Sequence, residues 1–310
     1  PDGRSFECKD NPKNTSISIS FLTDAKQLET LLPEYFSLVG EPVVTVSATY
    51  MTEIEWLAGR GYNTLGISFP AEFKGEIDLV TDYDKKAEEH IVSYLQDRFP
   101  RHSFLAEESG LISGKTSRRL KWVIDPIDGT TNYAHGLPFF AVSIALLERD
   151  RPIVAAVFDP LRAELFAASL GHTSTLNGAS IGVSTISSLD KSLLATGFPY
   201  DVRSSKDNNL SHFSRLTLCT QGVRRLGSAA LDLCYIACGR LDGYWELRLH
   251  PWDMAAGGLI VAEAGGKTTD LNGETDWLAN PSIIASNGHI HAALLSALHP
   301  ETQSDTSDLQ

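Results

Sequence analysis

The stretch Trp122-Val123-Ile124-Asp125-Pro126-Ile127-Asp128-Gly129-Thr130-Thr131-Asn132 decides how the rest of this chain is interpreted. An apolar run of strand type ends at Asp125, and Pro126 then fixes φ and removes a backbone donor. A second carboxylate follows at Asp128, and Gly129 lets the backbone approach a ligand closely. The hydroxyl and backbone N–H groups from Thr130 onward stand where a helix or helical turn would begin.

This order of residues suits phosphate chemistry. Carboxylates at a strand end suit Mg²⁺, which prefers oxygen ligands, and free N–H groups at a helix start suit a phosphate. Together they indicate metal-assisted phosphoryl transfer. A bare Asp-x-x-Asp is more often only an acidic turn after a strand. The full eleven-residue stretch favours the functional interpretation.

Two further acidic motifs accompany this stretch. They are Ala106-Glu107-Glu108-Ser109 and Trp252-Asp253-Met254-Ala255-Ala256-Gly257. The second opens a predicted Ala/Gly-rich helix, which places Asp253 at a positive helix end. Carboxylates packed together repel one another and stay ionised in a partly buried site only when cations neutralise them.

With these three motifs in this order, the sequence resembles the inositol monophosphatase family of Mg²⁺-dependent, lithium-sensitive phosphatases. The resemblance runs from about Ile77 to Leu298 and departs at Ala106, where the family usually has Gly. It implies an α/β fold, the layered αβαβα sandwich of the sugar phosphatases. It also implies a homodimer and a small-molecule phosphate ester as substrate.

The resemblance also implies a set of metal ligands. For a first Mg²⁺ they are Glu107, Asp125 and the backbone carbonyl of Ile127; for a second they are Asp125, Asp128 and Asp253. Asp84 would serve a third, weaker site through water, or it is an ordinary helix N-cap. We leave these two interpretations of Asp84 open.

Catalytic and substrate-binding roles follow from the same resemblance. Thr130 and Glu107 would orient and deprotonate the attacking water, and the N–H groups of Gly129 and Thr130 would cradle the phosphate. Glu246 would bind sugar hydroxyls, and Gly227-Ser228-Ala229 would line the substrate pocket as another helix start. The alternatives are a helix cap for Thr130 and an exposed strand-end acid for Glu246.

The implied reaction is the hydrolysis of inositol monophosphate or a similar small polyol phosphate, without a covalent intermediate. Two metals at the ends of an in-line displacement would activate water and stabilise the leaving alkoxide. Asp125, shared by both metals, would count among the catalytic residues. A phosphatase acting on another sugar or nucleotide phosphate is the nearest alternative.

Composition limits the partners. The chain has 310 residues and a net charge of −13, with 42% hydrophobic and 21% charged residues. This charge argues against nucleic acid and anionic membranes as partners, and the longest apolar runs are far short of a membrane span. The N-terminus is polar and unlike a signal peptide. None of the four cysteines forms a CxxC pair, so we expect a cytoplasmic protein.

The first quarter of the chain has a different character. Residues 15–76 resemble the N-terminal half of the acetoacetate decarboxylases, through Met51–Pro70 and Phe73–Glu76. The catalytic lysine of that family lies beyond the point where this resemblance stops. A divergent β-rich extension with a chance match is the alternative. Phosphatases of this type usually begin with a long amphipathic helix that covers the sheet, and no such helix is visible before Asp78.

We therefore expect an atypical N-terminal segment over residues 1–75, a catalytic domain over 76–298 and a disordered tail over 299–310. The junction is a natural fusion or a misassembled chain, and a non-catalytic or unstable chimera and a decarboxylase remain as rival interpretations. Without the covering helix, one face of the core sheet would expose apolar side chains.

Local patterns predict the elements. The spacing of Ala87, Ile91, Leu95 and Phe99 predicts one helix over residues 84–99. Further helices are expected at 228–238 and 253–264, and a weaker one at 24–38. Strands are expected at 77–81, 123–125, 140–147, 153–159, 163–168, 193–196, 244–247 and 283–286.

Overall fold

The computed structural model describes residues 82–112, 119–206 and 208–299, together with short segments of the first 73 residues. The chain divides into two compact units, Pro1–Glu76 and Ile77–Gln310. The expected strand at 77–81 and all of the expected tail except His299 lie outside the described residues.

The N-terminal unit is β-rich in its described parts. Strands β1 (Lys13–Leu22), β3 (Val43–Thr52) and β4 (Tyr62–Ser68) form an antiparallel sheet in that order, and β2 (Phe36–Leu38) pairs with β5 (Ala71–Phe73). Alternating valine and threonine make β3 a good strand former. The helix expected over residues 24–38 is wrong at its C-terminal end, because Phe36–Leu38 pairs as a strand.

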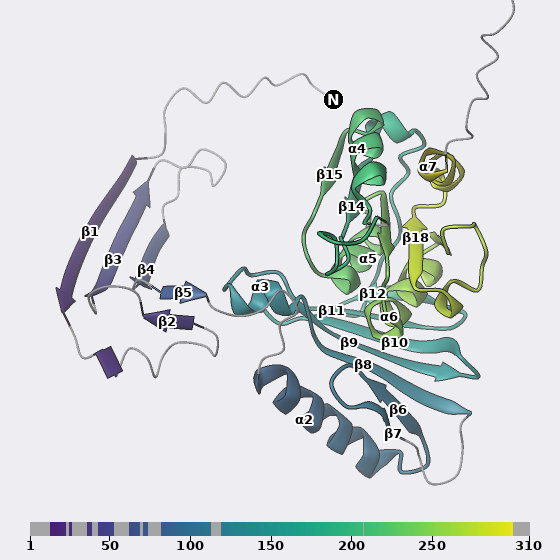
Figure 1. Ribbon diagram of the computed structural model, residues 1–310, viewed down its shortest axis with the longest axis horizontal. Coiled ribbons are helices and arrows are strands. Elements are labelled where there is room, and N and C mark those ends of the chain that lie inside the picture. Colours follow the sequence, from purple (N-terminus) through teal and green to yellow (C-terminus); the bar gives the residue numbers. More distant parts are fainter. Residues whose placement is uncertain are drawn as a thin grey trace, which may run out of the picture. The chain divides into compact units, whose positions relative to one another are not determined.

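The second unit begins with helix α2 (Asp82–Arg98) and a mixed eight-stranded sheet, in the order β13-β12-β11-β10-β9-β8-β6-β7 (Figure 1). Only the β6–β8 pairing is parallel in this sheet. The strands are β6 (Ser103–Ala106), β7 (Gly110–Ile112), β8 (Leu120–Asp128), β9 (Ala141–Glu148), β10 (Arg151–Asp159), β11 (Glu164–Ser169), β12 (His172–Leu176) and β13 (Ala179–Ser180).

A middle layer and a second sheet follow. Helices α5 (Ala229–Ala237) and α6 (Pro251–Glu263) pack against each other and against strands of both sheets. The second sheet has the order β15-β14-β16-β18-β17, and α4 (Leu210–Cys219) and α7 (His291–Leu298) cover its outer side. Its strands are β14 (Leu193–Thr196), β15 (Gly222–Arg224), β16 (Gly243–Leu247), β17 (Lys267–Thr269) and β18 (Ser282–Ser286).

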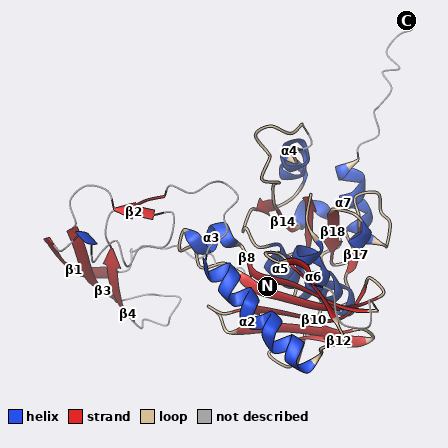
Figure 2. Cartoon of the chain, turned by 60° about the horizontal axis from the view of Figure 1, so that its bottom comes forward, coloured by secondary structure: helices blue, strands red, loops and turns tan. Residues whose placement is uncertain are grey.

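Burial of apolar side chains explains the layering. Small residues of α6, such as Ala255 and Ala256, allow the close packing of the middle layer, and together with α5 they form the largest core cluster. A second cluster joins α4 and α7 to the second sheet, and a third joins α2 to β6 and β8. Figure 2 shows α2 on the opposite side of the first sheet from α5 and α6. The expected αβαβα sandwich is therefore confirmed.

Among the described residues of the second unit, α2 covers only part of the outer face of the first sheet. Helix α2 packs on Ile124 of β8, next to Trp122, and Trp122 shares its face with Leu146 and Val154 through direct cross-strand pairs. Val154 is 41% exposed, and the cross-strand pair of Phe158 and Leu165 is 39% and 42% exposed.

Several elements differ from expectation. Strand β8 continues past Asp125 to Asp128, with an irregular register between these two residues, because the turn at Pro126 is absorbed as a bulge. Helices α4 and α7 were not predicted.

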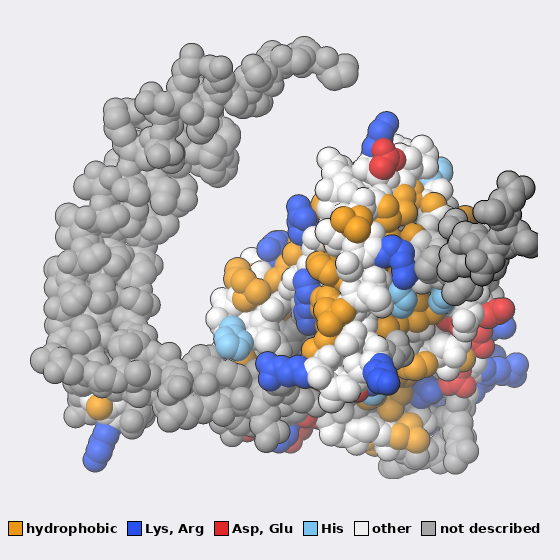
Figure 3. All heavy atoms as spheres, turned by 45° about the horizontal axis from the view of Figure 1, so that its top comes forward, with side chains coloured by type: hydrophobic (Ala, Val, Ile, Leu, Met, Phe, Trp, Pro, Cys, Tyr) orange, Lys and Arg blue, Asp and Glu red, His pale blue; other side chains and the backbone are white. Residues whose placement is uncertain are grey.

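Among the described helices, none combines the length and apolar composition needed to cross a bilayer. On the face drawn in Figure 3, hydrophobic side chains lie scattered among polar and charged ones.

Candidate active site

A pocket of about 120 Å³ lies in the second unit where the ends of both sheets meet the starts of the middle helices. It brings together most of the residues expected to be functional. The expected residues that line it are Glu107, Asp128, Gly129, Thr130, Gly227, Ser228, Ala229, Glu246 and Asp253. Three expected residues do not line the pocket. Asp84 contacts Thr130 of the lining, and Ile127 contacts both Thr130 and Asp125.

The turn after β8 has a conformation that requires glycine. Gly129 has φ of 102°, and a Cβ there would lie 3.0 Å from the Gly227 carbonyl oxygen and 3.2 Å from that of Phe139. Asp125, only 2% exposed, accepts a hydrogen bond of 3.0 Å from the Ile127 N–H. The short helix α3 (Thr130–Ala134) starts directly after Gly129.

Thr130 links the turn to α2. Its hydroxyl oxygen lies 3.2 Å from Asp84 Oδ1 and 3.1 Å from the Ile127 carbonyl oxygen. The N-cap position of α3 is Gly129, so Thr130 is not the helix cap that one interpretation expected. Helix α2 begins at Asp82, so Asp84 lies inside the first turn and the N-cap interpretation of Asp84 is wrong too.

Glu88 of α2 holds the turn that carries Glu107. Its two carboxylate oxygens accept hydrogen bonds from the backbone N–H groups of Glu108 at 2.8 Å and Ser109 at 2.9 Å. The Ser109 hydroxyl donates to the same carboxylate. Glu88 was not predicted as functional, because the apolar spacing of this helix says nothing about the roles of its acids. The available signal was a second acid four residues after Asp84, on the same face of the helix.

The carboxylates raise one another's pKa. Burial, with Glu108, Asp128 and Asp84 nearby, raises the pKa of Glu107 to about 7, although a hydrogen bond with Asp125 opposes the rise. Burial raises the pKa of Asp125 well above its usual value, with Glu107 and Asp128 as the largest charge contributions. This cluster is costly while its charges lack a cation.

Hydrogen bonds from α5 and α6 orient two of the expected ligands. Asp128 Oδ2 accepts from Ser228 Oγ at 2.5 Å and from the Ala230 N–H at 2.7 Å. These donors lower the pKa of Asp128, but burial outweighs them and holds it at about 6. Asp253 Oδ2 accepts from the His250 N–H at 2.6 Å, and burial and Asp128 raise the pKa of Asp253 well above its usual value.

These residues fit a hard divalent cation. Glu107 Oε2 is buried and has no hydrogen-bond partner among the described residues, and the surrounding donor set consists of carboxylate oxygens. Among the residues that the structure describes, no three such side chains already converge to enclose an ion. Metal binding would therefore require the carboxylates to converge, and the charge of the cation would offset their mutual repulsion.

The opposite wall of the pocket comes from the second sheet. Glu246, at the end of β16, accepts a hydrogen bond from the Tyr244 hydroxyl. Burial raises its pKa to about 7, and Tyr244 and Arg225 oppose the rise. Gly197 lies against this carboxylate, since a Cβ there would stand 2.0 Å from Glu246 Oε1. Sequence analysis did not identify Gly197, because only tertiary contact reveals its role.

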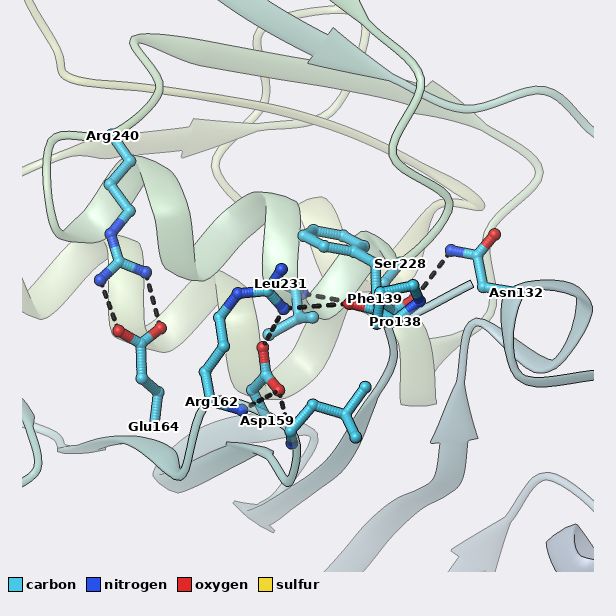
Figure 4. Close-up of polar contacts among 10 residues, drawn as sticks. Asn132, Pro138, Phe139, Asp159, Arg162, Glu164, Ser228, Leu231 and Arg240 are labelled. Atoms are coloured by element: carbon cyan, nitrogen blue, oxygen red, sulfur yellow. Dashed lines mark hydrogen bonds and ion pairs between the residues drawn. The ribbon is translucent and has the colours of Figure 1, made fainter. Parts of the chain in front are cut away.

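Two asparagines fix the loops around the pocket. Asn132 donates to the Phe139 carbonyl at 2.8 Å (Figure 4). It also donates to the Leu226 carbonyl at 2.8 Å and so ties α3 to the approach to α5. Asn209 donates to the Gly197 carbonyl at 2.6 Å and accepts from Trp245 Nε1 at 2.7 Å. Hydrogen bonds of these two buried side-chain amides thus hold the pocket walls in place.

Comparison with known proteins agrees with this geometry. The sequence profile described as the inositol monophosphatase family matches residues 54–303. The chain belongs to the inositol monophosphatase family. As a member, it is a phosphoric monoester hydrolase, and the family is generally metal-dependent.

Named relatives support the assignment. An inositol-1-monophosphatase of Synechocystis is 52% identical over 221 residues, which are 71% of this chain and 77% of that protein. The Nus factor SuhB of Escherichia coli K12 is 40% identical over 260 residues, 84% of this chain and 97% of that protein.

Solved structures of this family share the fold. The inositol monophosphatase from Anabaena superposes with a TM-score of 0.67 at 49% identity, over 69% of this chain and 85% of that one. The Thermotoga maritima enzyme gives a TM-score of 0.65 at 36% identity, over 73% of this chain and 84% of that one.

The N-terminal resemblance is also confirmed. A profile described as acetoacetate decarboxylase matches residues 1–100. It overlaps the start of the inositol monophosphatase match and extends past the unit boundary at Glu76. The inositol monophosphatase chain therefore carries an N-terminal segment similar to a second family.

Proposed function

We propose that this protein hydrolyses inositol monophosphate, or a similar small polyol phosphate, with Mg²⁺ as cofactor. The observation that carries the proposal is one pocket with carboxylates of raised pKa on one wall and Glu246 on the other. The first wall suits cations and the second suits hydroxyl groups. The printed name of the Synechocystis relative supports inositol 1-phosphate as the substrate to test first.

The proposed ligands follow from this arrangement. Glu107, Asp125 and the Ile127 carbonyl would hold one Mg²⁺; Asp125, Asp128 and Asp253 would hold a second; Asp84 would serve a third. When bound, the ions would neutralise the carboxylates and supply Lewis-acid stabilisation of the attacking and leaving oxygens. The orphaned Glu107 Oε2 supports the first site.

The side chains of this protein would then place the reactants. The backbone N–H groups of Gly129 and Thr130 would hold the phosphate. The Thr130 hydroxyl would orient the attacking water and Glu107 would accept its proton. Glu246 would accept a hydroxyl of the polyol, with Gly227, Ser228 and Ala229 forming the adjoining wall.

The test is phosphate release from inositol 1-phosphate, measured with Mg²⁺ and again after chelation. We expect Mg²⁺-dependent turnover that returns when the metal is restored. A panel of fructose bisphosphate, histidinol phosphate and nucleotide phosphates would show whether a small polyol phosphate is preferred. Turnover of a panel member with none of inositol 1-phosphate would overturn the substrate, and no phosphate release at all would overturn the function.

Lithium offers a second measurement. We propose uncompetitive inhibition with respect to substrate, with Asp125, Asp128 and Asp253, the proposed ligands of the second Mg²⁺, as the residues that would hold the lithium ion. Inhibition that added substrate relieves would contradict this proposal. Insensitivity to lithium would indicate a rearranged second metal site.

We further propose that residues 76–298 act as the catalytic domain of a cytoplasmic homodimer that does not bind nucleic acid. The net charge of −13 supports the last point. Limited proteolysis should yield a resistant fragment that begins near Ile77, where the two units divide. Borohydride trapping with a β-keto acid should give no adduct, since a decarboxylase would need an activated Schiff-base lysine.

A further inference from the structure

Asp232 is a buried acid of the pocket that the proposed function does not use. It lies in the first turn of α5, lines the pocket and is 1% exposed. Its Oδ1 atom has no hydrogen-bond partner among the described residues. An unpaired buried acceptor costs free energy comparable to a lost hydrogen bond, so a ligand that donates there would remove that cost.

The surroundings indicate what kind of group would bind. Burial raises the pKa of Asp232 well above its usual value; Glu246 adds more to the rise than Asp128 does, and Arg225 opposes it. Of these two neighbouring carboxylates, Glu246 therefore has the stronger electrostatic effect on Asp232. The Glu246 carboxylate already accepts a hydrogen bond from the Tyr244 hydroxyl. One Asp128 oxygen accepts hydrogen bonds from the Ser228 hydroxyl and the Ala230 N–H. Within the part of the chain that the structure describes, Asp232 Oδ1 has no such donor.

We propose that Asp232 is a specificity-determining residue, whose Oδ1 accepts a hydroxyl of the polyol beside Glu246. This inference rests on the proposed function and deepens it. Two acids on one wall present acceptor oxygens to hydroxyl donors, whereas a second phosphate or a carboxylate placed there would bring only further acceptors. The substrate class is then a monophosphate whose far end carries free hydroxyls, in preference to a bisphosphate.

The test uses two variants of the full chain. Asp232→Ala removes the acceptor, and Asp232→Asn keeps an acceptor oxygen of nearly the same size. Tyr235→Phe on the same helix is the matched control, because Tyr235 packs against Phe139 and Arg240 and does not line the pocket.

The readout is the ratio of kcat/KM for inositol 1-phosphate to that for cyclohexyl phosphate, which has no hydroxyl on its ring. We expect Asp232→Ala to lower this ratio by about 10- to 100-fold, Asp232→Asn to restore most of it, and Tyr235→Phe to leave it unchanged. An equal loss on both substrates, or no loss on either, would overturn the inference.

A binding measurement separates this inference from the proposed function. With Mg²⁺ and inorganic phosphate present, added myo-inositol should raise the Tm of the parent further, and Asp232→Ala should lose that extra shift. If the parent hydrolyses neither ester, the proposed function fails, while the myo-inositol shift still decides the inference. Equal shifts in parent and Asp232→Ala, or no shift in either, would overturn it.

Discussion

Two regions of the second unit bury carboxylates in opposite ways. Around the second sheet and the β10–β11 turn, buried aspartates are saturated with donors. Asp270 accepts from the N–H groups of Asn272 and Glu274, each at 2.8 Å, and from the Asn280 side chain at 3.0 Å. Asp242 accepts from Ser184 Oγ at 2.5 Å and the Leu193 N–H at 2.7 Å.

Asp159 follows the same rule, with donors from the N–H groups of Leu161 and Arg162 and an ion pair to Arg162 (Figure 4). In the pocket, Glu107 Oε2 and Asp232 Oδ1 lack any partner among the described residues. The difference teaches that burial alone does not indicate function. A buried carboxylate whose oxygens are all paired with donors stabilises the fold, whereas one that keeps an oxygen without a donor among the described residues can still accept a ligand.

The largest expected effect comes from breaking the pocket cluster. Asp125→Asn removes a charge proposed to be shared by both metals, so metal affinity should fall steeply and kcat by roughly 1,000-fold or more. The metal-free fold should remain intact, because the substitution removes repulsion from Glu107 and Asp128. Phosphate release and a thermal melt measure both effects. Activity within about tenfold of the parent would contradict the proposed site.

The reverse outcome is expected for a saturated carboxylate. Asp270→Ala should lower the free energy of unfolding by about 2–4 kcal/mol, because it leaves several buried donors without an acceptor. Activity per folded molecule at low temperature should stay near that of the parent. Denaturant unfolding and phosphate release give the two values. A loss of activity without a loss of stability would erase the distinction between the regions.

The pocket should also make the metal-free protein sensitive to pH. Glu107 and Glu246 have pKa values raised from 4.5 to about 7, so between these values the folded state holds more protons than the unfolded state. Stability should therefore fall as pH rises through this window, by about 2 kcal/mol or more, since one pKa unit is about 1.4 kcal/mol.

Thermal melts in chelator from pH 4.5 to 7.5 would measure this fall, and Mg²⁺ should reduce it at the upper end of the range. Glu246→Gln should flatten part of the curve. A metal-free stability that rises over the same range would show that the pocket carboxylates are already neutralised within the protein.

The smallest effect is expected from a change beside Glu246, which tests whether this carboxylate binds substrate hydroxyls. Gly197→Ala would place a methyl group against the Glu246 carboxylate and force it to move. Because the obstacle is the end of a side chain, stability should change by less than about 1 kcal/mol. KM for inositol 1-phosphate should rise by about tenfold, and KM for cyclohexyl phosphate should change less. An unchanged KM for both esters would count against Glu246 as the hydroxyl-binding group.

The sequence by itself determined the three acidic motifs, the family, the αβαβα fold and most helix and strand positions. Each of these depends on neighbours along the chain: an apolar run ending in Asp125, a glycine after Asp128, or a small-residue helix after Asp253. Even here the boundaries moved, since β8 runs on to Asp128 and Asp84 lies inside α2 instead of at its N-cap.

Only the tertiary structure decided which carboxylates are saturated and which are not. Asp232 and Asp242 look alike in sequence, yet the first has one oxygen without a partner among the described residues, and the second receives donors from residues 58 and 49 positions away. Glu88 and Gly197 gain their roles in the same way, through contacts with the Glu107 turn and with Glu246. The physical reason is that hydrogen-bond donors reach a buried acid mostly from other elements, and their positions are set by packing between layers.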